Sequence, residues 1–243
     1  YLVTIPSLIF VFASVIVLAM VLESLSVRRV QNESGSMVEV YRNDYGVIKV
    51  ADKLFKNEPA RLMYHGRTRH GGQSSLEEKS RSPLTYYPPS SGLALTLNYF
   101  HSKPEITNLK VGVLGLGVGE VASLSRPGDL FHFYEINPAV LRIANQHFTY
   151  LQDSSADISV TLGDGRVSLE RQIAQGLNLD FDVLLADAFS SDSVPTHLLT
   201  IEAFKVYFQA LKPKGILVVH VSNKFLTLEG IVKNNAESLG YSV

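Results

Sequence analysis

The sequence contains no cysteine, and this absence removes several structures and chemistries at once. Disulfides, thiolate metal sites and a cysteine nucleophile are excluded, and the composition fits a reducing compartment. The seven histidines are scattered without a His-Glu-x-x-His or comparable ligand spacing, so we expect no metal site. The formal net charge is −1, which provides no general electrostatic attraction to nucleic acid, and we expect no nucleic-acid partner.

Other common signatures are missing as well. There is no GxxxxGK[ST] phosphate loop, no suggestion of a Ser-His-Asp arrangement, no internal repeat and no low-complexity tract. What is present is a chain of 243 residues, 46% of them hydrophobic. This is enough for one sizeable core, or for one core with a small appended domain.

The first stretch differs in kind from the rest, because Tyr1 to Leu22 contains no charged residue. About 20 apolar residues are needed to span a bilayer, so we expect a transmembrane helix over 1–26 and a linker over 27–36. A buried core helix or a processed leader is the alternative. Arg28 and Arg29 follow, which predicts an inner- or plasma-membrane protein with its downstream domain in the cytoplasm.

The next two segments are expected to precede the main domain. Residues 37–75 predict a small antiparallel β-unit, with a hairpin around Asn43–Gly46 and a third strand at Arg61–Tyr64. Residues 76–110 predict a polar loop followed by a connecting helix over Ser90–Phe100, capped by Ser90 or Ser91.

From Val111 the pattern becomes regular, and it predicts a Rossmann-like nucleoside-binding domain over 111–243. We expect strands near 111–115, 131–135, 158–162, 181–186 and 215–221, and helices near 118–124, 138–149, 166–175, 197–211 and 227–238. Such alternation is typical of an α/β fold, a parallel sheet with helices on both faces. The chain lacks an initial Met and ends where a further strand would begin, so we expect a piece of a longer protein.

The segment Val111–Glu135 predicts the ligand site. It reads as a buried strand, a turn with Gly115, Gly117 and Gly119, a short helix, and a second strand that ends in Glu135. Glycines let the backbone approach a ligand, and the acid can bind ribose hydroxyls. A plain packing corner is the alternative. Glycines at alternate positions favour S-adenosylmethionine or a relative of it over NAD.

Acids at the ends of the predicted strands extend this site, because carboxyl ends of parallel strands share one edge. Glu135 fits a ribose, or it is a solvated strand-end acid. Asp164, followed by Gly165, could accept a proton from an adenine amine, cap the next helix, or do both. Asp187 follows four apolar residues and could deprotonate or orient an attacking amine, or simply form a turn.

Three loop residues add to the candidate site. Tyr86 and Tyr87 lie in a polar loop, where they could line a pocket or pack the loop down. Asp192 could bind a second ammonium group of a cationic substrate, or it is an ordinary loop residue.

Taken together, these segments resemble the spermidine synthase (polyamine aminopropyltransferase) family, specifically its bacterial members fused to membrane segments. The resemblance covers roughly Met37 to the end, and its motifs are YGVIKV (45–50), HGRTRHGGQ (65–73), PLTYYPPSSGLAL (83–95), VLGLGVGEVA (113–122), FYEINPAVLRIA (133–144), LGDGR (162–166) and DAFSSDSVPTHLLT (187–200).

The resemblance implies a small β-unit joined to an S-adenosylmethionine-dependent methyltransferase-type domain. It implies transfer of an aminopropyl group from decarboxylated S-adenosylmethionine to a putrescine-like amine, a step of polyamine biosynthesis. Carried over by position, Glu135 would hold the ribose, Asp164 the adenine, and Asp187 would act on the amine. Gln73 and Tyr86 would flank the substrate. A homodimer stays open as the assembly.

Two departures from the family pattern keep alternatives open. Val118 stands where the family has an aspartate that holds the amino group of the aminopropyl chain, and the stretch Asp187–Pro195 is longer than its counterpart. A valine cannot pair with an ammonium group, which favours a small-molecule methyltransferase that uses S-adenosylmethionine itself. A non-catalytic nucleoside- or polyamine-sensing domain attached to the membrane region is the other alternative, and a dehydrogenase is the least favoured.

Overall fold

The computed structural model describes residues 35–188, 195–222 and 227–243. The predicted transmembrane helix, the linker up to residue 34, and Asp192 lie outside these ranges. No helix within them is both long enough and apolar enough to cross a membrane.

The first sheet has four antiparallel strands in the order β1-β2-β3-β4: β1 Ser36–Asn43, β2 Gly46–Phe55, β3 Glu58–His65 and β4 Thr68–Ser74. The predicted hairpin is confirmed, and Asn43 pairs with Gly46 across its turn. β4 was not predicted as a strand, because its sequence TRHGGQS has no apolar alternation. Its conformation comes from pairing with β3, where Leu62 faces Gly72.

A loop with the short 3₁₀ helix η1 (Glu77–Lys79) leads to α2 (Gly92–His101). The hydroxyl of Ser91 accepts the backbone N–H of Ala94 at 3.2 Å, so the predicted helix begins with the predicted cap.

The second sheet has five parallel strands in the order β7-β6-β5-β8-β9: β5 Lys110–Leu114, β6 Leu130–Glu135, β7 Asp157–Leu162, β8 Phe181–Ala186 and β9 Leu211–Val219. The first four confirm the predicted strands. β9 starts earlier and ends earlier than predicted, because its pairing with β8 jumps from Leu211 to Ile216 and leaves Lys212–Gly215 as an irregularity.

The elements between these strands are η2 Glu120–Leu124, α3 Pro138–His147, α4 Gly165–Ala174, η3 Thr196–Leu198, α5 Ile201–Ala210 and α6 Glu229–Ser238. One predicted helix, over 197–211, is two helices in the structure. The Thr200 hydroxyl accepts the Ala203 N–H at 3.3 Å and starts α5 anew, which separates it from η3.

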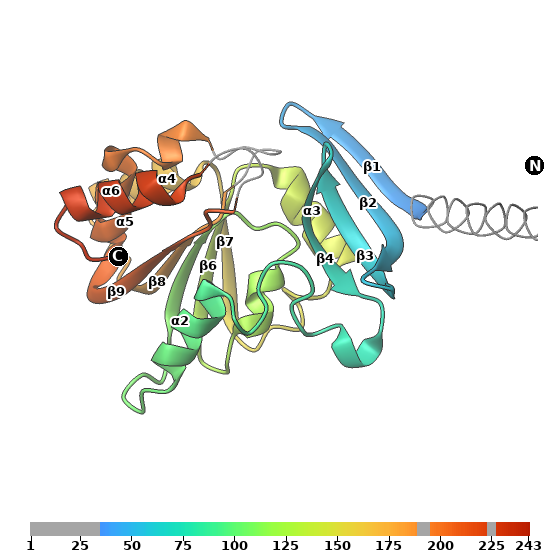
Figure 1. The fold of residues 1–243 in the computed structure, drawn as a ribbon, viewed down its shortest axis with the longest axis horizontal. Helices are drawn as coiled ribbons and strands as arrows, with labels where there is room; N and C mark the ends of the chain where they lie inside the picture. The colour runs from blue at the N-terminus through green and yellow to red at the C-terminus, as the bar shows by residue number, and fades with distance from the viewer. Residues whose placement is uncertain (1–34, 189–194, 223–226) are drawn as a thin grey trace, which may run out of the picture.

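Helices cover both faces of the parallel sheet, as predicted (Figure 1). On one face Leu97 and Phe100 of α2 pack in the same core as β5 and β6. On the other face Phe204 and Tyr207 of α5 pack with α4 and α6.

A third apolar cluster forms the seam between the two sheets. Ile48 and Met63 of the antiparallel sheet pack there against Val118 of the glycine turn and Ile143 of α3. Glu39 of β1 adds ion pairs to Arg142 at 2.5 Å and to His147 at 2.6 Å, both on α3. The antiparallel sheet therefore lies beside α3 and the glycine turn (Figure 1).

Candidate active site

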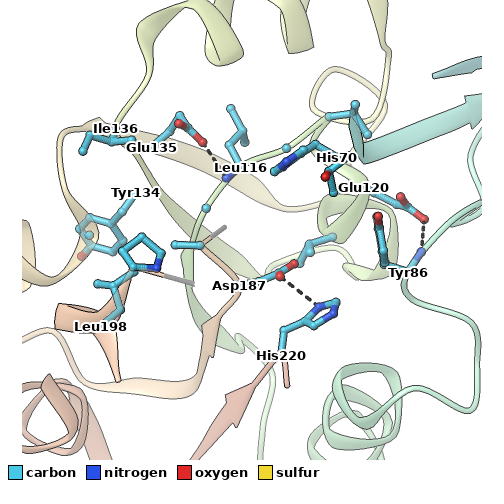
Figure 2. Close-up of a pocket in the computed structure, with 18 of the residues that line it drawn as sticks. His70, Tyr86, Leu116, Glu120, Tyr134, Glu135, Ile136, Asp187, Leu198 and His220 are labelled. Carbon is cyan, nitrogen blue, oxygen red and sulfur yellow. Dashed lines mark hydrogen bonds and ion pairs between the residues drawn. The ribbon is translucent and has the colours of Figure 1, made fainter. Parts of the chain in front are cut away.

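A cavity of about 420 Å³ lies at the carboxyl edge of the parallel sheet. The turns after β5, β6, β8 and β9 form one side of it, and Thr68, Arg69 and His70 of β4 form part of the other side. Tyr45, from the β1–β2 turn, and the loop with Tyr86 and Tyr87 complete the wall. Figure 2 shows Tyr86 among the wall residues. The cavity thus lies at the edge of the sheet where the strand-end pattern predicted a ligand site.

The glycine turn brings the end of β5 close to both sheets. Gly115 has φ +98°, and a Cβ atom there would lie 2.4 Å from the carbonyl oxygen of Asp187. Gly117 has φ +55°, and its Cβ would lie 2.8 Å from the carbonyl oxygen of His70. Both positions therefore need glycine, for the backbone angle and for the close approach.

Glu135 ends β6 at the cavity and is only 7% exposed. Its carboxylate accepts the backbone N–H of Asn137 at 2.8 Å and that of Leu116 at 3.1 Å. Burial raises the pKa of this carboxyl, while the hydrogen bonds from these N–H groups oppose the rise. Each carboxylate oxygen has a second lone pair, so hydroxyls of a ligand can bind as well.

Asp164 lies at the cavity together with Gly165. Its Oδ1 accepts the Val167 N–H at 3.0 Å, so the predicted helix cap is confirmed. Its Oδ2 lies 2.8 Å from Nε2 of His197, a further residue of the cavity wall. The adenine contact stays a prediction, and it would share Asp164 with both of these partners.

Asp187 follows β8 directly, and its backbone N–H donates to the carbonyl of Leu114 at 3.0 Å. Its Oδ2 accepts the hydroxyl of Tyr87, and its Oδ1 lies 3.0 Å from Nδ1 of His220 (Figure 2). Asp187, predicted to act on the attacking amine, therefore lies at the cavity and is joined there to Tyr87 and His220.

The two tyrosines fulfil both predicted alternatives, because they line the cavity and hold their loop in place. The Tyr86 hydroxyl donates to the Arg69 carbonyl at 2.5 Å. Glu120, which is 3% exposed, holds the loop in place. Its carboxylate accepts the N–H groups of Thr85 at 2.5 Å and of Tyr86 at 3.3 Å. Burial raises the pKa of Glu120 despite these bonds.

Two predicted residues do not reach the cavity wall. The Gln73 side chain donates to the Ser80 carbonyl at 2.9 Å and to the Thr149 hydroxyl at 2.7 Å, so its amide joins β4 to neighbouring loops. Gly119, with φ +81°, precedes η2 as its N-terminal cap residue. The other predicted glycines, Gly115, Gly117 and Gly165, do line the cavity. Asp192 lies outside the described residues.

His220 is the main residue of the site that the sequence reading missed. It comes directly after β9, so the strand-end rule that found Asp187 also applies to it. The predicted strand at 215–221 ran over position 220 and hid the signal. Arg69 and Glu120 were missed as well: the first lies in the unpredicted strand β4, and the second behind a glycine turn that predicted only backbone contacts.

The glycine turn and buried Glu135 form one end of the cavity. The close approaches that Gly115 and Gly117 permit are to the carbonyl oxygens of Asp187 and His70, so the turn packs tightly within the protein while it lines the cavity. Among the residues that the structure describes, no group of three or more histidine, aspartate or glutamate side chains could hold a metal.

Comparison with known proteins shows a relationship in sequence. No family model matches the chain. It is 34% identical over 137 residues to a polyamine aminopropyltransferase from Vibrio vulnificus, a match that covers 55% of this chain and 43% of the relative. It is 28% identical over 113 residues to a probable polyamine aminopropyl transferase from Bifidobacterium longum, over 45% of this chain and 23% of the relative. The matches thus span less than half of either relative.

Solved structures show the same fold. The spermidine synthase of Thermotoga maritima matches 84% of this chain and 63% of its own, with a TM-score of 0.56 and 15% identity. A probable spermidine synthase from Corynebacterium glutamicum matches 76% of this chain and 63% of its own, with a TM-score of 0.59 and 18% identity. The chain is thus similar in sequence, over part of its length, to two polyamine aminopropyltransferases, and it shares its fold with two spermidine synthases.

Proposed function

We propose that the protein is a transferase that moves an aminopropyl group from decarboxylated S-adenosylmethionine to a polyamine or a related amine. The observation that carries the proposal is the gathering of Glu135, Asp164 and Asp187 around one cavity, each from the end of a different parallel strand. The sequence similarity to the Vibrio vulnificus aminopropyltransferase supports the same class of reaction.

The donor's nucleoside half would bind at the β5–β6 end of the cavity. The Glu135 carboxylate, held by the N–H groups of Leu116 and Asn137, has lone pairs left for two ribose hydroxyls. Asp164 and Gly165 would lie at the adenine, where the aspartate's oxygens can accept a hydrogen bond from the exocyclic amine.

The transfer itself would take place near Asp187. The amine nitrogen forms a bond to the carbon beside the sulfonium, the carbon–sulfur bond breaks, and its electron pair stays on sulfur as a neutral thioether. One proton must leave the amine. The rings of Tyr86 and Tyr87 lie in the wall nearby, where aromatic faces can stabilise cationic groups. Holding both substrates in one cavity supplies much of the rate.

Calorimetry and product analysis test the proposal. We expect the protein to bind decarboxylated S-adenosylmethionine and methylthioadenosine, and mass spectrometry to find an aminopropylated amine after incubation with putrescine. The Asp187→Asn variant should keep donor affinity but lose about 10²–10⁴-fold in turnover. The matched control is Asp153→Asn, because Asp153 pairs only loosely with Arg81, at 3.9 Å. Failure of all nucleosides to bind at millimolar concentration would refute the donor site, and binding without turnover would favour a sensor.

Methyl transfer from S-adenosylmethionine is the second candidate, and two observations favour it. Val118, where the resemblance expects an acid, is 1% exposed and packs in the seam. Arg69 lines the cavity, and its guanidinium lies 5.7 Å from the ring centroid of Tyr86, so a cation beside the cavity would suit the carboxylate of intact S-adenosylmethionine better than an ammonium group. Preferential binding of S-adenosylmethionine, with a methylated product, would decide for this reaction.

We also propose that residues 1–26 anchor the protein in a membrane, with the cavity on the cytoplasmic side. The uncharged run from Tyr1 to Leu22 and the arginines after it support this placement. Fractionation of cells that express the full chain tests it, and recovery of the intact chain free of membranes would oppose it.

A further inference from the structure

Each oxygen of the Asp187 carboxylate has its own partner in the structure, which bears on the role of Asp187 in proton transfer. The Tyr87 hydroxyl donates to its Oδ2, and Nδ1 of His220 lies 3.0 Å from its Oδ1. The side chains of His220 and Asp187 are 17% and 19% exposed. Both carboxylate oxygens thus have a hydrogen-bond partner before any substrate binds.

The fold places Asp187 and His220 together for a simple geometric reason. β8 and β9 are parallel neighbours, and the last residue pair of their register is Ala186 with Val219. Asp187 and His220 are the next residues of these two strands, and the His220 N–H donates to the Ala186 carbonyl at 3.0 Å. The pair is therefore an extension of the sheet, which holds it more firmly than a loop would.

Tyr87 reaches the pair from a different element, the loop clamped by Glu120. The carboxylate of Glu120 accepts the N–H groups of Thr85 and Tyr86, directly before Tyr87. Burial, and then the negative charge of Asp187, raise the pKa of Tyr87 well above its ordinary value. Tyr87 therefore stays protonated and acts only as a hydrogen-bond donor to Asp187.

The imidazole is the better proton acceptor of this group near neutral pH. Burial alone would lower the pKa of His220, but the hydrogen bond and the charge of Asp187 outweigh it, and the pKa lies above its ordinary value of 6.5. Both oxygens of the Asp187 carboxylate already face a partner, the Tyr87 hydroxyl at Oδ2 and Nδ1 of His220 at Oδ1. Two further titratable groups lie near the ring: Tyr86, whose ring centroid is 5.8 Å from that of His220, and Tyr87, joined through Asp187.

We propose that His220 is the catalytic base of the transfer and that Asp187 is a positioning residue that orients the imidazole. This inference rests on the proposed function. As the amine nitrogen bonds to the donor carbon and the carbon–sulfur electron pair moves to sulfur, the amine proton passes to Nε2 of His220, the nitrogen turned away from Asp187. The Asp187 carboxylate stabilises the resulting imidazolium, which returns its proton to solvent after product release.

The pH dependence of kcat separates this role from a structural one. For the wild type we expect kcat to rise with pH around a midpoint at the His220 pKa, above 6.5. His220→Gln should lose about 10²–10⁴-fold in kcat and lose this limb of the profile, with little change in donor affinity. Asp187→Asn should keep the limb but move its midpoint to lower pH, because the charge that raises the imidazole pKa is gone.

His147→Gln is the matched control, since His147 also pairs with a carboxylate, Glu39 at 2.6 Å, but lies outside the cavity wall. It should leave the midpoint unchanged. A limb that survives in His220→Gln would overturn the role of His220 while the transferase function stands. If the wild type transfers no group at all, the proposed function fails, and the proton transfer fails with it.

A second measurement needs no turnover. Titration of the His220 imidazole by nuclear magnetic resonance should show a lower pKa in Asp187→Asn than in the wild type. An unchanged His220 pKa would contradict the proposed coupling even if both variants fold and bind nucleoside normally.

Discussion

The two sheets build one cavity in different ways. The parallel sheet contributes residues at the carboxyl ends of its strands or directly after them, among them Gly115, Glu135, Asp187 and His220. The antiparallel sheet contributes one end only, through Tyr45 in the β1–β2 turn and the start of β4. The antiparallel sheet therefore closes one side of the cavity, and the parallel sheet supplies most of its polar groups.

This difference shows what strand direction decides. In a parallel sheet the carboxyl ends of all strands lie at the same edge, so strand direction alone brings the polar residues that follow different strands close together. In an antiparallel sheet the ends alternate, and only packing against another element selects the end that faces a site. Here that selection is made at the seam, by apolar residues of β2 and β3 against Val118 and Ile143.

The largest effect should come from Val118→Asp, which would break the seam where the two sheets meet. A carboxylate among Ile48, Met63 and Ile143 would be desolvated without a partner, and we expect a loss of about 3–5 kcal/mol in the free energy of unfolding at pH 7. Urea denaturation measures it. Val118→Asn is the control of equal size. The loss in unfolding free energy should shrink toward acid pH only for Val118→Asp, because only its carboxylate becomes neutral there. If the Val118→Asp variant instead keeps wild-type stability and binds decarboxylated S-adenosylmethionine more tightly, position 118 accepts an acid that binds the aminopropyl group.

A smaller loss is expected from Gly115→Ala, at the end of the central parallel strand. The new methyl group would lie 2.4 Å from the Asp187 carbonyl oxygen, and residue 115 has φ +98°. Overpacking and the positive φ together should cost about 2–4 kcal/mol in unfolding free energy. Thermal or urea unfolding measures it, and turnover should fall too because Asp187 must move.

Gly176→Ala separates the two causes of that loss. Gly176 also has a positive φ, +76°, but a Cβ atom there would meet nothing within 4 Å. Only the backbone cost of about 1–2 kcal/mol should appear. Equal losses at positions 115 and 176 would show that the close approach to Asp187 contributes nothing.

The smallest effect should come from Glu39→Gln, which removes the ion pairs between β1 and α3. The hydrogen bond from Arg142 lowers the pKa of Glu39 below its ordinary value of 4.5; burial opposes this, and His147 adds to it. A carboxyl with a lowered pKa stabilises the fold above its unfolded pKa, and that contribution disappears as pH falls through the folded pKa. We expect a loss of at most about 1 kcal/mol at pH 7, because exposed ion pairs contribute little.

Denaturation at several pH values checks this prediction. The free energies of unfolding of the wild type and of Glu39→Gln should converge as pH falls through the folded-state pKa of Glu39, which lies below 4.5, because residue 39 is then neutral in both proteins. Glu105→Gln, at an exposed acid, is the control and should match the wild type throughout. A difference that persists in acid would mean that the carboxylate's charge is not what joins β1 to α3.

Local patterns were sufficient for most elements. Apolar runs located β5, β6, β7 and β8, and the predicted cap located the start of α2. They failed at β4, whose glycines and polar residues carry no strand period, and at β9, where an irregular pairing lengthens the strand at its start. Both elements depend on a neighbouring strand for their conformation, which no window of the sequence contains.

The sequence by itself determined the parallel α/β domain and the edge where its strands deliver Glu135, Asp164 and Asp187, because direction and periodicity are local properties. Only the tertiary structure decided which side chains become partners. It paired Asp187 with His220 and Tyr87, turned Gln73 toward Thr149, and packed Val118 into the seam. These contacts join residues far apart in the chain, and their geometry follows from how the two sheets and the clamped loop pack against one another.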